Sequence, residues 1–202
     1  MLLVIHPEYP QPRKLKRAAE ILAKGGLLCY PTETGYGIGC DMYQRKTVER
    51  LFRLTNRPKN KPASLLCKDF KQVSQFGYIN NVYFRIARRI FPGPYTLVLE
   101  ATKEVPRHLH GKRREVGIRV PSNPVIMGIL EEMENPIMNV AARTFEGEYI
   151  DDPHVIEHVW RNELGAVIDC DLLQEDPSTV VDLTGDVAEI LREGQGDPNV
   201  FL

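Results

Sequence analysis

The chain lacks the features that mark membrane, secreted and metal-bound proteins. No apolar run reaches the roughly 20 residues that a membrane-spanning helix needs. The apolar start, residues 1–7, is too short for a signal peptide. None of the cysteines, Cys29, Cys40, Cys67 and Cys170, pairs with another at the short spacing of a zinc site, so we expect buried reduced thiols and no bound structural metal. These absences favour a cytoplasmic protein.

Internal repeats and low-complexity tracts are also absent. The composition, 43% hydrophobic and 26% charged over 202 residues, is typical of a soluble globular protein. A chain of this length can bury a large core without metals or disulfides. We therefore expect a single domain spanning residues 1–202.

The net charge of −1 hides a strong segregation of charge along the chain. Residues 45–119 carry 18 Lys/Arg against 5 Asp/Glu, whereas residues 120–202 carry 3 against 18. Such asymmetry suggests that the central stretch handles an anion, either a nucleotide or RNA. The alternative is that the two stretches interleave in the fold, so that their opposite charges partly neutralise each other. The sequence does not decide between these two interpretations.

Apolar periodicity predicts helices and strands that alternate early in the chain and give way to successive strands late. Helices are expected over residues 11–24, 46–54, 80–90 and 153–160, and one more is expected to start at Asn123. Strands are expected over residues 27–30, 63–67, 95–101, 116–120, 137–141, 166–169, 179–183 and 187–192. The predicted fold class is α/β of the α+β type, a twisted open mixed β-sheet with helices packed on it.

Residues 31–41 (PTETGYGIGCD) are the most informative stretch of the sequence. They follow an apolar strand, and we interpret them as a loop whose alternate glycines let a ligand approach the backbone. Thr32 and Thr34 add two hydroxyls, and cations follow in residues 57–62 (RPKNKP). The spacing is Gly-x-Gly-x-Gly, which is not the dinucleotide-binding fingerprint. Taken alone, the glycines would fit a strand corner that holds sheet curvature about equally well.

The order and spacing of several motifs resemble the YrdC-like domain of threonylcarbamoyl-AMP synthases. The motifs are residues 31–41, 57–62, 91–96 (FPGPYT), 119–124 (RVPSNP), 177–182 (PSTVVD) and 191–194 (LREG). The resemblance covers nearly the whole chain. Residues 5–7 (IHP), 103–107 (KEVPR) and 194–197 (GQGD) are most similar to the YciO branch of that family.

The resemblance implies a YrdC-like fold with a concave basic groove and a two-step synthesis. L-threonine and bicarbonate form a carbamate, which attacks the α-phosphate of ATP with Mg²⁺ assistance. Pyrophosphate leaves, and the threonylcarbamoyl-AMP that remains serves the modification of tRNA to threonylcarbamoyladenosine. The implied ATP and phosphate contacts are Arg57, Lys61 and Arg192, and the implied threonine contacts are Thr34, Arg119 and Ser178.

The chain departs from the family at a Lys-x-Arg…Ser-x-Asn tetrad. Thr55 stands at the lysine position, Arg57 is kept, and Ala141 and Arg143 replace the serine and the asparagine. One charge-assisted phosphate contact is worth roughly 1.5–3 kcal/mol, and about 1.4 kcal/mol is tenfold in rate. We therefore expect weak synthesis of this adenylate or synthesis of a related one, and we assign no catalytic residue. Arg143 could compensate for the losses or redirect the groove toward RNA phosphates.

Binding of double-stranded RNA or tRNA without chemistry is the alternative function. Basic runs could hold RNA phosphates with a strong salt dependence. The candidate contacts are Arg85, Arg88, Arg89, Lys112, Arg113 and Arg114. No aromatic-rich stacking motif supports base-specific readout. His154 and His158 have helical spacing but no matching carboxylate motif, so we interpret them as surface residues and predict no metal site.

Overall fold

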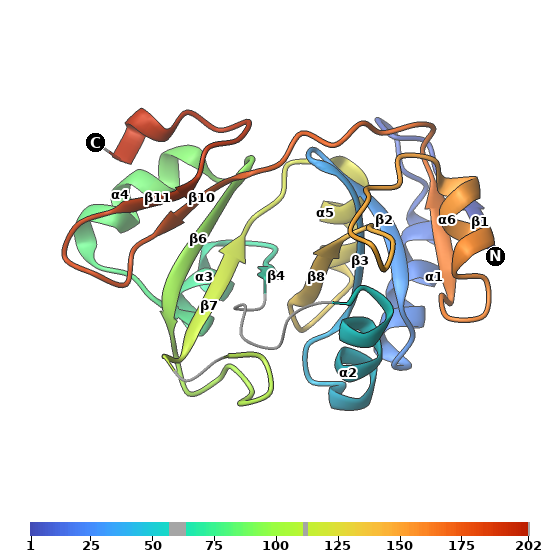
Figure 1. Ribbon diagram of the computed structural model, residues 1–202, viewed down its shortest axis with the longest axis horizontal. Coiled ribbons are helices and arrows are strands. Elements are labelled where there is room, and N and C mark those ends of the chain that lie inside the picture. Colours follow the sequence, from blue (N-terminus) through green and yellow to red (C-terminus); the bar gives the residue numbers. More distant parts are fainter. Residues whose placement is uncertain (57–63, 111–112, 202) are drawn as a thin grey trace.

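One mixed β-sheet crosses the structure, a computed structural model that describes residues 1–56, 64–110 and 113–201 (Figure 1). Within these residues the strand order is β1-β9-β2-β3-β8-β4-β7-β6-β10-β11, and β5 pairs with β6 off this path. The strands are β1 (Leu2–Val4), β2 (Leu28–Thr32), β3 (Gly35–Asp41), β4 (Ser64–Leu66), β5 (Gly77–Tyr78), β6 (Tyr95–Ala101), β7 (Glu115–Arg119), β8 (Ile137–Ala141), β9 (Ala166–Asp169), β10 (Thr179–Asp182) and β11 (Glu189–Arg192).

The sheet combines parallel and antiparallel neighbours, which confirms the predicted mixed sheet. β9 runs parallel to β1 and β2, β4 runs parallel to β7, and β10 runs parallel to β6. β3 runs antiparallel to both β2 and β8, and β10 and β11 form an antiparallel pair. The antiparallel pair β2–β3 occupies the third and fourth places of the strand order, and its connecting turn holds Glu33 and Thr34.

Helices pack on both faces of this sheet and form two apolar cores. The helices are α1 (Pro12–Ala23), α2 (Arg45–Leu54), α3 (Phe70–Phe76), α4 (Asn81–Ile90), α5 (Pro124–Glu131), α6 (Pro153–Val159) and the short 3₁₀ helix η1 (Pro198–Phe201). Alternate residues of β2 belong to different cores, since Leu28 packs with α1 and α5 whereas Cys29 packs with the larger cluster that includes α2, α3, α4 and α6. Side chains on a strand point to opposite faces in turn, so the two cores lie on opposite faces.

Helix starts follow the local chemistry of the sequence. The Asn123 side chain accepts from the backbone N–H of Val125 at 2.9 Å, and Pro124 follows at the first helical position of α5, as predicted. Asn80 likewise caps α4 by accepting from the N–H of Tyr83. Within the described residues, no helix is long and apolar enough to cross a membrane.

The prediction of a glycine loop over residues 35–39 is wrong, because these residues form strand β3. A Cβ on Gly37 would lie 2.5 Å from Oδ1 of Asn139, and one on Gly39 would lie 2.3 Å from the hydroxyl oxygen of Tyr30. The missing side chains therefore make room for the protein's own Tyr30 and Asn139, which hydrogen-bond to each other at 2.8 Å. Of the two interpretations of the glycines, the strand corner is closer to the observed structure.

The connection from β9 to β10, residues 170–178, is called the crossing segment here. It runs along one side of the molecule, from the half that holds β2 and α6 to the half that holds β6 and β10 (Figure 1). In doing so it passes the β2–β3 turn. It therefore brings its own side chains beside residues that come from distant strands.

Candidate functional site

The β2–β3 turn and the end of β7 meet in a buried polar corner, called the Arg119 corner, made of Thr32, Glu33, Thr34 and Arg119. The Arg119 guanidinium donates from Nη1 to Oγ1 of Thr34 at 2.8 Å. The Thr32 hydroxyl donates to the Gly35 carbonyl at 2.7 Å and accepts from the Thr34 N–H at 3.2 Å, which fixes the turn. Two residues that the sequence predicted as threonine contacts, Thr34 and Arg119, are thus in direct contact.

Glu33 completes the Arg119 corner with an ion pair that leaves hydrogen-bonding capacity unused. Its Oε1 lies 2.8 Å from Nη2 of Arg119, and the two side chains are only 12% and 5% exposed. The approach is close but poorly aligned, since within the described residues both Glu33 oxygens and Arg119 Nε and Nη2 lack a partner with hydrogen-bond geometry. Buried charged atoms without hydrogen bonds are costly. A ligand that supplied such bonds would therefore be stabilised here.

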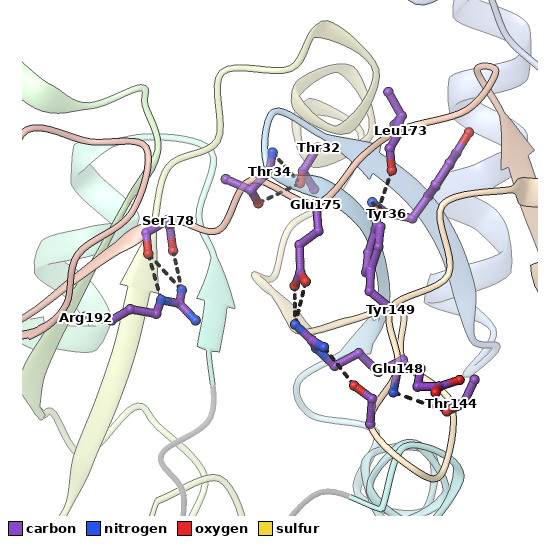
Figure 2. A network of polar contacts seen from close by, with 12 residues as sticks. Thr32, Thr34, Tyr36, Thr144, Glu148, Tyr149, Leu173, Glu175, Ser178 and Arg192 are labelled. Carbon is purple, nitrogen blue, oxygen red and sulfur yellow. Dashed lines mark hydrogen bonds and ion pairs between the residues drawn. The ribbon is translucent and has the colours of Figure 1, made fainter.

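Ser178 and Arg192, predicted in different roles, bind each other at the far end of the crossing segment (Figure 2). Arg192 donates from Nε and Nη2 to the Ser178 carbonyl at 3.0 and 2.8 Å, and from Nη2 to its hydroxyl at 3.1 Å. Ser178 is buried, and its hydroxyl also lies 2.9 Å from that of Thr96. The two side chains form one polar cluster that joins β11 to the start of β10.

Burial and neighbouring charges act on the pKa of Arg192. Burial lowers the pKa of its guanidinium, and the nearby charges of Arg119 and Arg143 lower this pKa further. The carboxylate of Glu175 acts in the opposite sense. Arg119 and Arg143 therefore lie near enough to Arg192 to act on its guanidinium, as does Glu175 of the crossing segment.

Arg143 and Glu175 form the third polar contact of the site. Nη2 of Arg143 contacts both carboxylate oxygens of Glu175, Oε2 at 2.6 Å, and Nη1 donates to the Gly147 carbonyl at 2.7 Å. In Figure 2, Glu175 points from the crossing segment into the space between Thr34 and Tyr149. Arg143 is thus hydrogen-bonded to a carboxylate, whereas the Glu33 carboxylate beside the buried Arg119 is close but poorly aligned.

Tyr149 holds the crossing segment against the β2–β3 turn. Its hydroxyl donates to the Leu173 carbonyl at 3.0 Å and accepts from the N–H of Tyr36. Gly35 has a φ of +109°, and a Cβ there would lie 2.3 Å from the Tyr149 hydroxyl oxygen. Both the left-handed backbone and the close approach require glycine. Burial raises the pKa of Tyr149 to about 12, so at neutral pH its hydroxyl keeps the proton that it donates.

Of the predicted phosphate contacts, Arg57 and Lys61 lie outside the described residues, as does the candidate RNA contact Lys112. The chain before them can be followed. Thr55 donates its hydroxyl to the Leu51 carbonyl of α2 at 2.9 Å, and the Asn56 amide donates to the Phe145 carbonyl at 3.3 Å. Asn56 therefore ties the end of α2 to the turn that follows Arg143.

The other candidate RNA contacts are exposed but stand apart from the Arg119 corner. Arg85, Arg88 and Arg89 lie on α4, which Figure 1 places beside β10 and β11, away from β2 and β3. Arg113 and Arg114 are exposed just before β7. Their role in binding RNA stays a prediction.

Among the described residues we find neither a metal-binding cluster nor a reactive cysteine. These hold no group of three or more His, Cys, Asp or Glu side chains that could bind a metal ion. Burial raises the pKa of the Cys40 and Cys170 thiols to about 12, and those of Cys29 and Cys67 are raised as well. Buried, protonated thiols are poor nucleophiles at neutral pH.

Two surface hollows lie away from the predicted site residues that the structure describes. A hollow of about 640 Å³ is lined by Leu3, Arg13, Lys14, Lys16, Arg17 and Glu20, and one of about 250 Å³ lies beside α3 and α4. Neither is lined by a residue of the Arg119 corner or by Ser178 and Arg192. The polar contacts described above define the candidate site.

Comparison with known proteins places this chain and its fold in one family. The family described as "Telomere recombination" (Sua5/YciO/YrdC) matches residues 20–194, so the chain belongs to the Sua5/YciO/YrdC family. It is 38% identical over 200 residues to the uncharacterized protein YciO of Escherichia coli K12, covering 98% of this chain and 97% of that protein. The crystal structure of E. coli YciO superposes with a TM-score of 0.94 at 36% identity, covering 100% and 99% of the two chains.

More distant relatives carry a named activity. The threonylcarbamoyl-AMP synthase of Pyrococcus abyssi is 30% identical over 183 residues, which are 90% of this chain but only 54% of that protein. The crystal structure of P. abyssi Sua5 complexed with L-threonine superposes with a TM-score of 0.89 at 28% identity, covering 96% of this chain and 57% of that one. This chain thus corresponds to about half of the archaeal protein.

Proposed function

We propose that this protein makes a threonylcarbamoyl-AMP-like adenylate from L-threonine, bicarbonate and ATP. The observation that carries the proposal is the Arg119 corner, where Thr34, Glu33 and Arg119 meet from distant parts of the chain. The L-threonine bound to the archaeal relative supports an amino acid as ligand. This goes further than family membership, because the Escherichia coli and Haemophilus influenzae relatives that match 98% of this chain are uncharacterized proteins.

The chemistry of the Arg119 corner suits an amino acid and its carbamate. The Arg119 guanidinium would bind the ligand carboxylate, because planar arginine pairs well with a planar anion. The unpartnered oxygens of Glu33 would accept from the ligand N–H. The Thr34 hydroxyl, half-buried beside Arg119, would bond the ligand hydroxyl. Each of these side chains would orient the carbamate for attack.

ATP would lie beside the amino acid, on the side of Arg192. The carbamate oxygen attacks the α-phosphorus, the bond from that phosphorus to the β-phosphate oxygen breaks, and pyrophosphate leaves with the electron pair. We assign Arg57, Lys61 and Arg192 to the phosphates, where the spread charge is best neutralised by positioned cations. Mg²⁺ would arrive with ATP and be held mainly by its phosphates, in the way this ion usually binds.

The test is the release of pyrophosphate by the purified protein. With Mg-ATP, L-threonine and bicarbonate together, we expect pyrophosphate and an adenylate whose mass corresponds to threonylcarbamoyl-AMP. Omission of either threonine or bicarbonate should abolish both products. Pyrophosphate release that ignores threonine, or none with the full mixture, would contradict the proposal.

Binding of tRNA or double-stranded RNA is a second candidate, favoured by the exposed arginines of α4. Arg85, Arg88 and Arg89 present three cations on one helix, and phosphates would bind them without sequence preference. Retention of RNA that weakens steeply with salt, in the absence of pyrophosphate release, would support binding as the function. Replacing all three arginines by glutamine should then abolish retention.

A further inference from the structure

We propose that Glu175 is an internal anion that occupies the anion-binding position of Arg143 until a ligand phosphate displaces it. The inference rests on the proposed function, since it concerns the phosphate side of the same site. It makes Arg143, which stands where the resemblance places an asparagine, a phosphate contact of this chain. The crossing segment then carries a competitor for the ligand.

The first argument is the form of the Arg143 contact. One guanidinium nitrogen contacts both carboxylate oxygens of Glu175, and the other is held by the Gly147 carbonyl. A carboxylate bound in this way uses the same donors that a phosphate would use. The Arg143 side chain is 41% exposed, so an incoming anion can reach it from solvent.

The second argument is that Glu175 is not needed to hold the crossing segment in place. On one side, Leu173 is fixed by the Tyr149 hydroxyl and by its own N–H, which donates to the Asp151 carbonyl at 3.0 Å. On the other side, the Gln195 N–H donates to the Pro177 carbonyl at 2.9 Å, and Arg192 holds Ser178. Release of the Glu175 carboxylate would therefore leave the backbone on both sides of it fastened.

The third argument is the balance of charge. The positive charges of Arg119 and Arg143 lower the pKa of the Arg192 guanidinium. The negative charge of Glu175 raises this pKa and so acts against both arginines. Without a ligand, these cations repel one another, and the carboxylates of Glu33, beside Arg119, and of Glu175, beside Arg143, partly relieve the repulsion. A phosphate chain carries more charge and more acceptor oxygens than a carboxylate, so it should win the exchange.

The test compares Glu175→Gln with Asp176→Asn, which removes the same charge from the adjacent, exposed residue of the crossing segment. Binding of inorganic pyrophosphate and of Mg-ATP to the full-length protein is measured by calorimetry. We expect Glu175→Gln to bind both probes roughly three- to tenfold more tightly, because a surface ion pair no longer competes. The affinity of Asp176→Asn for both probes should stay within about twofold of that of the unmodified protein, because solvent and salt screen an exposed charge.

A second variant tests whether the gain passes through Arg143. In the Glu175→Gln/Arg143→Met protein the gain should disappear, and Arg143→Met alone should bind the probes more weakly than the unmodified protein. Unchanged or weaker binding by Glu175→Gln would overturn the inference, and so would an equal gain from Asp176→Asn. Tighter binding that persists in the Glu175→Gln/Arg143→Met protein would also overturn the inference.

The inference and the proposed function fail in different measurements. If both probes bind and tighten as described but no pyrophosphate is released from the full mixture, the proposed synthesis fails and the anion exchange stands. If synthesis is observed but Glu175→Gln does not tighten binding, only the inference fails. If neither the unmodified protein nor Glu175→Gln binds either probe, both fail.

Discussion

Two arginines of the same site differ in how the protein treats their charge. Arg119 is buried, and within the described residues two of its nitrogens lack an aligned partner, although Glu33 lies 2.8 Å away. Arg143 is half exposed, and its two terminal nitrogens are bound by Glu175 and Gly147. The first arrangement leaves capacity for a ligand, and the second already holds an anion supplied by the protein.

The difference separates the contribution of each arginine to stability from its contribution to binding. A buried charge that loses its partner is expensive, whereas an exposed pair contributes little. Arg119 should therefore support both the fold and the ligand. Arg143 should affect the ligand and hardly the fold.

The largest effect is expected from Arg119→Met, which keeps the apolar stem and removes the charge. Glu33 would then be a buried carboxylate without a cation, so we expect a loss of about 3–5 kcal/mol in the free energy of unfolding, measured with urea. The double variant Glu33→Gln/Arg119→Met should recover part of this loss, because no charge stays buried. A loss below about 1 kcal/mol in the single variant would mean that the pair is not buried as described.

Tyr149→Phe tests whether the crossing segment is fastened to the β2–β3 turn. The change removes the acceptor of the Tyr36 N–H and the donor to Leu173, so we expect a loss of about 1–3 kcal/mol in urea unfolding. Tyr43→Phe is the matched control. It removes a hydroxyl that donates to the Glu104 carbonyl at 3.2 Å, but from an exposed side chain. Equal losses in the two variants would show that the contacts of Tyr149 are not special.

Thr34→Val tests the ligand side of the Arg119 corner. The valine keeps the shape of the side chain but removes the hydroxyl that accepts from Arg119. We expect L-threonine to bind about tenfold more weakly, as the loss of one hydrogen bond near a charged group implies. Thr34→Ser keeps the hydroxyl and should stay near the original affinity in the same titration. A valine variant that binds as well as the serine variant would remove Thr34 from the site.

Much of the fold could be predicted from the sequence wherever apolar runs were long and uninterrupted. β6, β8 and β9 have the predicted bounds, since Tyr95–Ala101, Ile137–Ala141 and Ala166–Asp169 are apolar strands. The short elements β1, α3 and β5 were not predicted. Helix α3 was missed although Asp69 accepts from the Gln72 N–H and the Gln72 side chain accepts in return from the Lys68 N–H, a pattern close to a capping box.

Strand β3 could not be predicted because the reason for its glycines lies elsewhere in the chain. Glycine is rare in strands, so its repetition favoured a loop. The side chains that fill the space beside it, Tyr30, Asn139 and Tyr149, come from β2, from β8 and from the chain after β8. Nothing in the order of residues 35–41 indicates these neighbours.

Some of the residues that the sequence analysis singled out contact each other in the structure, whereas their roles in binding stay predictions. The resemblance placed Thr34 with Arg119 and drew attention to Ser178 and Arg192, and the contacts within each pair exist. Glu175 was missed, because it lies in an irregular segment without periodicity and its partner is 32 residues away. Only the excess of acidic residues in the last part of the chain hinted that some of them meet cations.

The smallest effect, and the sharpest test of the comparison, is expected from Arg143→Met, the same substitution as at Arg119. The pair with Glu175 is solvent-accessible, so its loss should change the free energy of urea unfolding by only about 0–1 kcal/mol. Glu175 would remain half-buried but close to Arg192, and it could turn to water at little cost. The loss in the free energy of unfolding should therefore be several-fold larger for Arg119→Met than for Arg143→Met. Both variants should bind the ligand more weakly. If Arg143→Met were as destabilising as Arg119→Met, the Glu175 contact would be a structural clamp, and its carboxylate would not be free to yield to a phosphate.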